Sequence, residues 1–541
     1  MKIQISMEAR ASSPVRRGSN RIPMNPALHK LANATTRRPL PWLSTLLLAG
    51  LAFIAPSCTG GKATPPPPVI TVAPLTAADV QNVVQDAAQA VAAPMVIAVA
   101  DRAGNILAVF RNPTAPVTAT GNYGTTVDPN ELAVGLARTA AFFSSNQAPL
   151  SSRTVRFVSG IHFPPGVNGT VPADLYGIEN TNRGCPLNAS FLPGQAINPA
   201  RSINGTATGL GVITGKADTN DSDPNAVTPG GVPLFKGGGV VGGVGVVSDT
   251  PANAEFAAFS GANNAGFLPS AAQLPPPGVV IVGGIALPFV NQTTLPAGTT
   301  AGSMTGTFLV SPAAGSLPPE GDLVGPSAGT GGLTQSDVAA IVQQAVDTAN
   351  KTRAVIRLPS GSRTRMSIAV TDLDGTLLAL HRMPDGTVFS LDVAVAKARN
   401  VVWFSGAGIA DLPGMPSGTA ITNRTISFGA QPLFPPGIDG SGPGPFFNLF
   451  LSDVANPCSQ GSQPSNANQS GIVFFPGSLP LYKNGVLVGG LGVSGDGVDQ
   501  DDYVTFHGAQ GFLPLSNIQA DNNSIQGVRM PFLKFPRNPE Q

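Results

Sequence analysis

The sequence predicts a mixed α/β (α+β) protein in which one domain occurs twice, and three observations carry this prediction. The chain has 541 residues, more than one hydrophobic core usually organises, so two domains are expected. Short motifs in residues 75–290 return in the same order in residues 333–533, and such internal repetition fixes the architecture. The 64 Gly and 53 Pro indicate compact elements joined by long, turn-rich connections.

Each repeat is predicted to begin with an amphipathic helix and a β-hairpin. The segments Leu75–Val80 and Leu333–Val338 both place Asp three residues after Thr, and apolar residues then recur at helical spacing. This is the pattern of a capped helix start. Met95–Gly104 and Met366–Gly375 each end in an Asp-x-x-Gly turn before a second β-rich run, which predicts a hairpin in both repeats.

A second helix and a long insertion follow in each repeat. The helices are expected over 131–143 and 391–404. Both insertions carry the sequence Phe-Pro-Pro-Gly, at Phe163 and at Phe434. Loops of this length are usually functional or disordered, and the repeated motif favours an ordered loop.

Each repeat is predicted to close with a glycine-rich β segment, a short helix and a terminal strand, the latter over 284–289 and 527–532. The sequence Gly-Gly-x-Gly in this segment could cradle a phosphate. However, no P-loop lysine follows, so strands packed closely against a helix are the favoured interpretation. Residues 291–332, rich in Gly, Thr, Ser and Pro, are expected to form a linker.

Residues 1–57 are predicted to be an export leader. Arg37 and Arg38 precede an apolar run over 42–54, which is too short to span a bilayer as a mature helix. The small residues before Cys58 resemble a bacterial lipobox, in which the cysteine is diacylated, and ordinary signal cleavage is the alternative. Residues 58–74 would then be a proline-rich tether that holds the domains off a membrane, in the periplasm or outside the cell.

The charge of the mature chain argues against nucleic-acid binding. Eight of the 31 basic residues but one of the 30 acidic residues precede Cys58, so the remainder carries 23 basic and 29 acidic residues. The mature chain therefore has a net charge near −6. A nucleic-acid-binding protein instead carries an excess of basic residues that attracts the phosphate backbone. We therefore expect no nucleic-acid partner.

The order of these motifs resembles the GlcG/HbpS-like haem-binding domain family over most of 75–290 and 333–533. The C-terminal repeat carries the resemblance in Arg382-Met383, Lys397-Ala398-Arg399 and Gly489–Gly495. The N-terminal repeat departs from it at Asn112, Leu136 and Val247-Ser248. The resemblance implies a mostly antiparallel five-stranded sheet with packed helices in each domain. It also implies two domains paired as a pseudo-dimer, with higher oligomers left open.

The resemblance further implies haem, or another small planar or acidic molecule, as ligand. Among the histidines, His381 and His507 are candidates in the C-terminal repeat alone, because Phe110 and Ser260 stand at the equivalent positions. An ordinary hydrogen-bonded histidine is the alternative at both positions.

Four arginines are further candidates for ligand binding, because they occur at matching places in both repeats. Arg111 matches Arg382, and Arg138 matches Arg399. A guanidinium suits bidentate contacts to a carboxylate such as a haem propionate, and exposed arginines without a ligand are the alternative. No metal site and no catalytic set is expected from the spacing of the residues.

Cys185 and Cys458, one in each insertion, are predicted to form a disulfide. Export supplies an oxidising compartment, and equivalent points near a pseudo-two-fold axis approach each other. Two free thiols are the alternative.

The sequence thus favours an exported, non-enzymatic protein that binds a small molecule. A structural or protein-interaction module without a pocket, and an enzyme of haem or glycolate metabolism, remain as alternatives.

Overall fold

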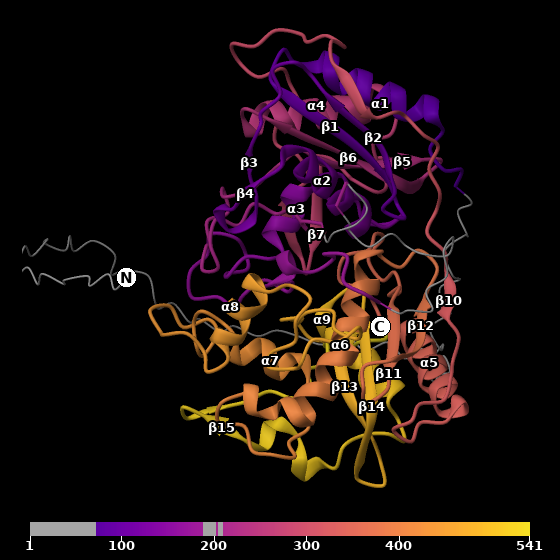
Figure 1. Ribbon diagram of the computed structural model, residues 1–541, viewed down its shortest axis with the longest axis vertical. Coiled ribbons are helices and arrows are strands. Elements are labelled where there is room, and N and C mark those ends of the chain that lie inside the picture. The colour runs from indigo at the N-terminus through magenta and orange to yellow at the C-terminus, as the bar shows by residue number, and fades with distance from the viewer. Residues whose placement is uncertain (1–71, 188–201, 204–208) are drawn as a thin grey trace, which may run out of the picture. The chain divides into compact units, whose positions relative to one another are not determined.

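The computed structural model describes residues 72–187, 202–203 and 209–541 (Figure 1). The predicted leader, Cys58 and most of the proline-rich tether lie outside the described residues. The described residues belong to one compact unit. No helix within the described ranges has the length and apolar character needed to cross a membrane. We call residues 72–290 the N-terminal half, 291–332 the connecting segment and 333–541 the C-terminal half.

The N-terminal half alternates helices with strands. Its elements are α1 (Ala77–Ala90), β1 (Met95–Asp101), β2 (Ile106–Arg111), β3 (Ala119–Thr120), β4 (Thr126–Val127), α2 (Pro129–Phe143), α3 (Ser152–Phe157), β5 (Gly231–Lys236), β6 (Gly239–Ser248), α4 (Pro251–Asn264), β7 (Val279–Val282) and β8 (Ile285–Pro288).

The connecting segment and the C-terminal half continue the series. The connecting segment holds β9 (Thr307–Val310) and β10 (Gly321–Val324). The C-terminal half holds α5 (Gln335–Ala349), β11 (Ser367–Thr371), β12 (Leu377–Arg382), α6 (Phe389–Ser405), α7 (Asn423–Gly429), α8 (Phe447–Ala455), β13 (Ser478–Lys483), β14 (Val486–Ser494), α9 (Val498–Gly508), β15 (Ser524–Ile525) and β16 (Val528–Arg529).

The first helix of each half begins as its sequence predicts. The Thr76 hydroxyl accepts a hydrogen bond from the backbone N–H of Asp79, and the Asp79 carboxylate accepts one from the N–H of Thr76. Thr334 and Asp337 form the same reciprocal cap on α5. These caps satisfy backbone donors that the first helical turn leaves unpaired.

Two antiparallel five-stranded sheets form the centre of the fold. Their strand orders are β5-β6-β1-β2-β9 and β10-β12-β11-β14-β13. Read from the β-hairpin outward, the two orders are equivalent, because β11, β12, β13 and β14 occupy the places of β1, β2, β5 and β6. The predicted α+β class and the antiparallel sheets are confirmed.

Helices cover both faces of the N-terminal sheet (Figure 1). Ile97 and Val99 of β1 share a buried cluster with residues of α1 and α4, whereas Val96 and Ala98 cluster with residues of α2. Because side chains alternate along a strand, β1 is apolar on both sides, which explains its continuous hydrophobic sequence.

The glycines of β6 and β14 allow the covering helix to approach the sheet. A Cβ atom on Gly245 would overlap the carbonyl oxygen of Ala133 in α2, and one on Gly492 would overlap that of Ala394 in α6. The close strand-to-helix packing predicted from Gly-Gly-x-Gly is therefore confirmed.

The connecting segment does more than link the halves. Its strand β9 pairs with β2, and its strand β10 pairs with β12. The turn aspartates hold it in place: Asp101 Oδ2 accepts from the N–H of Ser316, and Asp372 Oδ2 accepts from the Thr330 hydroxyl. The fifth strand of each sheet thus comes from residues predicted as linker.

The predicted terminal strands fold back on their neighbours instead of joining the five-stranded sheets. Strand β8 pairs with β7, and β16 pairs with β15, each as a two-stranded hairpin. The turns between them use the left-handed conformation at Gly283, Gly284 and Gly527, which glycine adopts without strain.

Polar and aromatic contacts join the two halves. Arg102 of the N-terminal half donates to Asp385 Oδ1 of the C-terminal half at 2.9 Å. Arg357, in the same half as Asp385, donates to its Oδ2 at 2.6 Å and holds the carboxylate in place. Nearby, the rings of Phe143 and Phe389 stack with centroids 4.0 Å apart. The ends of α2 and α6 therefore meet at the boundary between the halves.

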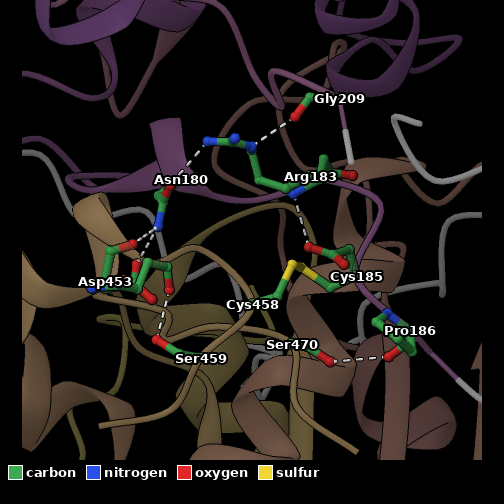
Figure 2. Close-up of a disulfide and its surroundings, with 12 residues drawn as sticks. Asn180, Arg183, Cys185, Pro186, Gly209, Asp453, Cys458, Ser459 and Ser470 are labelled. Atoms are coloured by element: carbon green, nitrogen blue, oxygen red, sulfur yellow. Dashed lines mark hydrogen bonds between the residues drawn. A yellow bond between two sulfur atoms is a disulfide. The ribbon is translucent and has the colours of Figure 1, made fainter. Parts of the chain in front are cut away.

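Cys185 and Cys458, the pair predicted from the sequence, form a disulfide between the two insertions (Figure 2). Their Cα atoms are 5.5 Å apart, within the range that a disulfide requires. Beside the bond, Asn180 donates to Asp453 Oδ2 at 2.7 Å, so the same junction also carries a buried polar contact.

Candidate functional site

The arginines predicted to bind a ligand make hydrogen bonds inside the fold. Arg138 Nη2 donates to the carbonyl of Gly104 at 2.7 Å, and Arg399 Nε donates to the carbonyl of Gly375 at 3.0 Å. Both glycines belong to the Asp-x-x-Gly turns. The matching positions of these two arginines are thus explained by one structural task, the anchoring of a hairpin turn to a helix.

The second arginine pair supports the backbone that follows the hairpin. Arg382 Nη2 donates to the carbonyl of Gly386 at 2.6 Å, and Arg111 Nη2 donates to that of Pro116 at 2.9 Å. Burial lowers the pKa of Arg382 to about 9, because the charged guanidinium loses its water there.

The candidate histidines lie on separate elements. His381 on β12 contacts Asp322 of β10, with Nδ1 and Oδ1 2.7 Å apart. His507 on α9 packs against Tyr503 and Phe506, and burial lowers its pKa. The structure thus does not gather the six predicted residues around one cavity, because local partners hold each of them.

An open cleft of about 550 Å³ lies between the two halves. Tyr176 of the first insertion and Phe428 and Phe474 of the C-terminal half contribute aromatic rings to its walls. Lys534 and Arg537 lie at its exposed rim. We call this space the outer cleft; its size is that of a small-molecule site.

A smaller space, the inner cavity, adjoins the outer cleft. It measures about 60 Å³, and both spaces are lined by Asp174, Val355 and Val498. Most of the remaining lining is apolar and comes from both halves, including Phe143 and Phe389. Asp501 is one of the few polar residues in its wall.

Asp501 forms a buried ion pair with Lys397. Lys397 Nζ lies 3.0 Å from Asp501 Oδ2 and donates to the carbonyl of Val493 at 2.8 Å. The same ammonium stands over the ring of Phe475, 4.9 Å from its centroid. The other oxygen, Asp501 Oδ1, is buried without a hydrogen-bond partner.

The N-terminal half builds the same junction from apolar residues. Gly230 faces Ala254 there, whereas the equivalent Gly477 faces Asp501 and Lys397. Leu136 is the residue equivalent to Lys397, because each directly precedes the alanine that the two repeats share, Ala137 and Ala398. The charged pair is therefore confined to the C-terminal half.

Burial changes the proton affinity of both members of the pair. Loss of water raises the pKa of Asp501 to about 7, which the ammonium of Lys397 opposes. Burial also lowers the pKa of Lys397, against the attraction of Asp501. A carboxyl that titrates near neutral pH beside a cavity is a common feature of functional sites.

Neither space offers a set of ligands for a metal or a haem iron. The residues that line the outer cleft and the inner cavity include no His, Met or Cys. The phenol of Tyr176 is buried, and burial raises its pKa well above the ordinary value. No group of three His, Cys, Asp or Glu able to hold a metal occurs among the residues for which coordinates are described. Haem iron ligation by the usual residues does not fit this site.

Residues 333–510 match the HbpS-like family. Its model is described as haem degrading protein HbpS-like, and both Lys397 and Asp501 lie within the matched residues. The family resemblance inferred from the sequence is confirmed for this part of the chain.

Similar proteins were found among curated sequences and solved structures. A stretch of 150 residues is 26% identical to the corrinoid adenosyltransferase PduO of Salmonella typhimurium (strain LT2), covering 28% of this chain and 33% of PduO. The chain therefore spans about a third of that relative's length. A PduOC:haem complex is 21% identical, covers 33% of this chain and 94% of its own, and has a TM-score of 0.22. Protein ORFY of Klebsiella pneumoniae is also 21% identical, covers 33% and 86%, and has a TM-score of 0.21.

Proposed function

We propose that this protein binds a planar, apolar molecule with carboxylate groups in the outer cleft, and that porphyrins such as haem are the ligand class. The observation that carries the proposal is the combination of aromatic walls with a cationic rim in a cleft of about 550 Å³. The HbpS-like match over residues 333–510 favours a haem-type ligand within that class.

The charges at the rim favour an anionic end of the ligand. Lys534 is 67% exposed and pairs with Asp499 at 2.8 Å. Arg537 is exposed beside it. By contrast, Arg424 is already compensated by Asp499 and Asp502. Lys534 and Arg537 are the exposed cations of the rim, and Lys534 would exchange its exposed contact with Asp499 for a carboxylate of the ligand. Flexible side chains of this kind can close on an entering propionate.

The walls favour the flat, apolar part of the ligand. Phe428 is partly exposed in the cleft, whereas Phe474 and Tyr176 are buried in the layer beneath its surface. A planar aromatic molecule in the cleft would remove apolar surface from water, and its ring could pack against aromatic side chains in a stacked or edge-to-face arrangement; both effects favour binding. Because the lining holds no His, Met or Cys, binding in this proposal rests on the ring and the carboxylates and not on the iron.

We further propose that the protein acts outside the cytoplasm, attached to a membrane through Cys58, and that its two halves arose by duplication. The matching strand orders and the paired turn anchors of Arg138 and Arg399 support a duplication. In this view the N-terminal half replaces the second subunit of a dimer.

A titration of the full-length protein in detergent with haemin and with iron-free protoporphyrin IX tests the binding proposal. We expect both to bind with similar affinity. The double variant Lys534→Ala/Arg537→Ala should weaken both by about tenfold or more, the effect of losing one charge-assisted hydrogen bond. The matched control, Lys483→Ala/Arg529→Ala, removes two exposed cations of the same half that do not line the cleft and should bind normally.

Two results would contradict the proposal. Binding of haemin without binding of protoporphyrin IX would mean that an iron ligand outside the cleft carries the affinity. Equal losses in the rim variant and in the control would mean that general charge, and not the rim of the outer cleft, attracts the ligand.

A further inference from the structure

A polar groove in the C-terminal half lies apart from the spaces described above. It consists of two adjoining hollows of about 270 and 440 Å³, and Trp403, Gln463 and Asn468 line both of them. These volumes are close to those of small-molecule sites. Among the described residues, none that lines this groove also lines the outer cleft or the inner cavity. We call it the indole groove.

The indole of Trp403 is held in place at the end of α6. Its Nε1 donates to Asp411 Oδ2 at 3.1 Å, and the same oxygen accepts from the N–H of Ser462 at 2.9 Å. A Cβ atom on Gly408 would overlap the five-membered ring, so backbone packs against the indole there. Trp403 nevertheless remains partly exposed. A ligand that binds against a ring already fixed in this way loses little affinity to ordering of the protein.

The N-terminal half buries the positions that are exposed in this groove. Trp403 corresponds to Phe142, since each stands four residues after the arginine that the two helices share, and Phe142 is only 2% exposed. Leu373, in the Asp-x-x-Gly turn, is 42% exposed, whereas the equivalent Arg102 is buried. The fold is therefore built in one half without an exposed indole, and the exposed indole of the other half calls for a reason other than folding.

Amide side chains beside the indole have unused hydrogen-bonding atoms. Gln463 Oε1 accepts from Gln460 and Gln469, which orients the amide, while its Nε2 has no partner in the described part of the chain. Asn468 Nδ2 donates to the carbonyl of Asp374 at 3.2 Å, and its Oδ1 accepts from none of the described groups. Both side chains are partly exposed. The groove thus offers a ligand both a donor and an acceptor.

We propose that the indole groove is a second binding site and that its ligand is a neutral pyranose sugar, such as a β-linked glucose or N-acetylglucosamine unit. A pyranose with equatorial hydroxyls has faces of C–H groups and a polar rim. The C–H groups pack favourably on the indole of Trp403, because the ring face carries partial negative charge. Each hydroxyl both donates and accepts, which suits the amides of Gln463 and Asn468. The exposed Leu373 adds apolar surface to the wall.

The charges in the groove favour a neutral ligand over an anion. Arg399 is the one cation among the described lining residues. Its guanidinium is buried and donates to the backbone carbonyls of Gly375 and Leu187. Asp374 is exposed in the wall and would repel a phosphate or a carboxylate. The same carboxylate can accept hydrogen bonds from neutral hydroxyls.

Titration of the full-length protein with cellobiose and with N,N′-diacetylchitobiose tests the proposal, in a detergent without a sugar headgroup. Tryptophan emission reports on the groove directly, because Trp42, the other tryptophan of the sequence, lies in the predicted leader. We expect a saturable change in emission and a matching heat in calorimetry, with a dissociation constant in the millimolar range for an open groove. Absence of saturable binding for both sugars would overturn the proposal.

Two variants assign the binding to the groove. Trp403→Phe introduces the residue that the N-terminal half carries at this position, so folding is expected, and it should weaken sugar binding about fivefold. Gln463→Glu keeps the oxygen that orients the side chain but replaces the free donor, and it should also weaken binding about fivefold. Calorimetry measures both affinities, and thermal unfolding checks that each variant is folded.

Matched controls change the same kinds of side chain outside the groove. Phe535→Leu removes an exposed aromatic ring, and Gln510→Glu replaces an exposed amide in the same half; neither residue lines the groove. Both controls should bind sugar normally. Unchanged affinity in Trp403→Phe, or equal losses in the controls, would overturn the assignment to the indole groove.

The second site stands apart from the porphyrin proposal. Trp403→Phe leaves the outer cleft unchanged and should retain protoporphyrin binding, and Lys534→Ala/Arg537→Ala should retain cellobiose binding. Adenosine tests the other ligand class that stacks on an indole. Binding of adenosine without binding of either sugar would assign the groove to nucleobases and overturn the sugar proposal. The two proposals can therefore fail separately.

Discussion

Arg102 of the N-terminal half donates to Asp385 of the C-terminal half across 2.9 Å. Asp385 also accepts from Arg357, whose side chain is fully buried. The carboxylate keeps a pKa below its usual range although burial opposes this, because both guanidinium groups attract its charge. One aspartate thus neutralises a cation from each half.

We predict that Asp385→Asn lowers the free energy of unfolding by about 3 kcal/mol, because Arg357 and Arg102 lose the charge that compensates their burial. Asn tolerates the left-handed backbone of this residue, φ 60°, so backbone strain does not contribute. Urea denaturation gives the measurement. Asp521→Asn, which breaks the exposed pair with Arg529, is the control and should cost less than about 1 kcal/mol. Equal effects would contradict the prediction.

The disulfide should contribute more than any single side-chain contact. Cys185 and Cys458 are separated by 273 residues, and the chain-entropy model gives about 5 kcal/mol for a loop of this length. We predict that Cys185→Ser/Cys458→Ser lowers the urea midpoint, and that reduction of the unmodified protein lowers it equally. Titration of the unfolded, unreduced protein should find neither thiol free. Two reactive thiols in that titration would contradict the bond.

The sequence predicted the local elements of the fold and missed the sheet edges. The Asp-x-x-Gly turns after Asp101 and Asp372 identify hairpins because a turn depends on adjacent residues. Strands β9 and β10 are four residues long and lie in a segment whose composition is typical of a loop. Their strand structure comes from pairing with β2 and β12, a long-range contact that no local pattern indicates.

The close contacts of glycines in β14 and β6 predict that replacing either glycine by alanine strongly destabilises the fold. Ala at position 492 would place its Cβ against the Ala394 carbonyl, and Ala at position 245 would meet the Ala133 carbonyl. Backbone on both sides leaves little room to relax, so we expect Gly492→Ala and Gly245→Ala each to cost about 3 kcal/mol or more. Thermal unfolding measures the loss. Gly325→Ala, where no atom lies within 4 Å of the added Cβ, should be tolerated; a comparable loss there would contradict the explanation.

The candidate site was harder to predict than the fold. When the two repeats are aligned, Lys397 stands at the position of Leu136, and Asp501 stands at the position of Ala254. The positions are 104 residues apart, and only the tertiary structure shows that Lys397 and Asp501 touch. Conversely, Arg138 and Arg399 were predicted to bind a ligand because they occur at matching positions in the two repeats. The sequence does not reveal that backbone carbonyl groups already accept hydrogen bonds from both side chains.

We predict that the mature protein begins at Cys58 with a diacylated thiol and partitions into detergent, because two acyl chains give stable membrane attachment. Cys58→Ser should release the protein into the aqueous phase. Intact-mass measurement of the purified protein distinguishes the outcomes. An unmodified cysteine, or a membrane fraction unchanged in Cys58→Ser, would contradict lipidation and leave ordinary signal cleavage.

Asp392 predicts a stability effect that depends on pH. Its Oδ2 accepts from the N–H of Asn182, its Oδ1 is unpaired, and burial raises its pKa to about 6. The folded protein therefore binds this proton more tightly than the unfolded chain, and ionisation destabilises the fold as the pH rises from about 4 to about 6. Asp392→Asn keeps the bond from Asn182 and removes the charge. We expect the variant to match the unmodified protein near pH 4 and to exceed its unfolding free energy by about 3 kcal/mol at pH 8. Urea denaturation at both pH values checks this, and a difference that does not change with pH would contradict it.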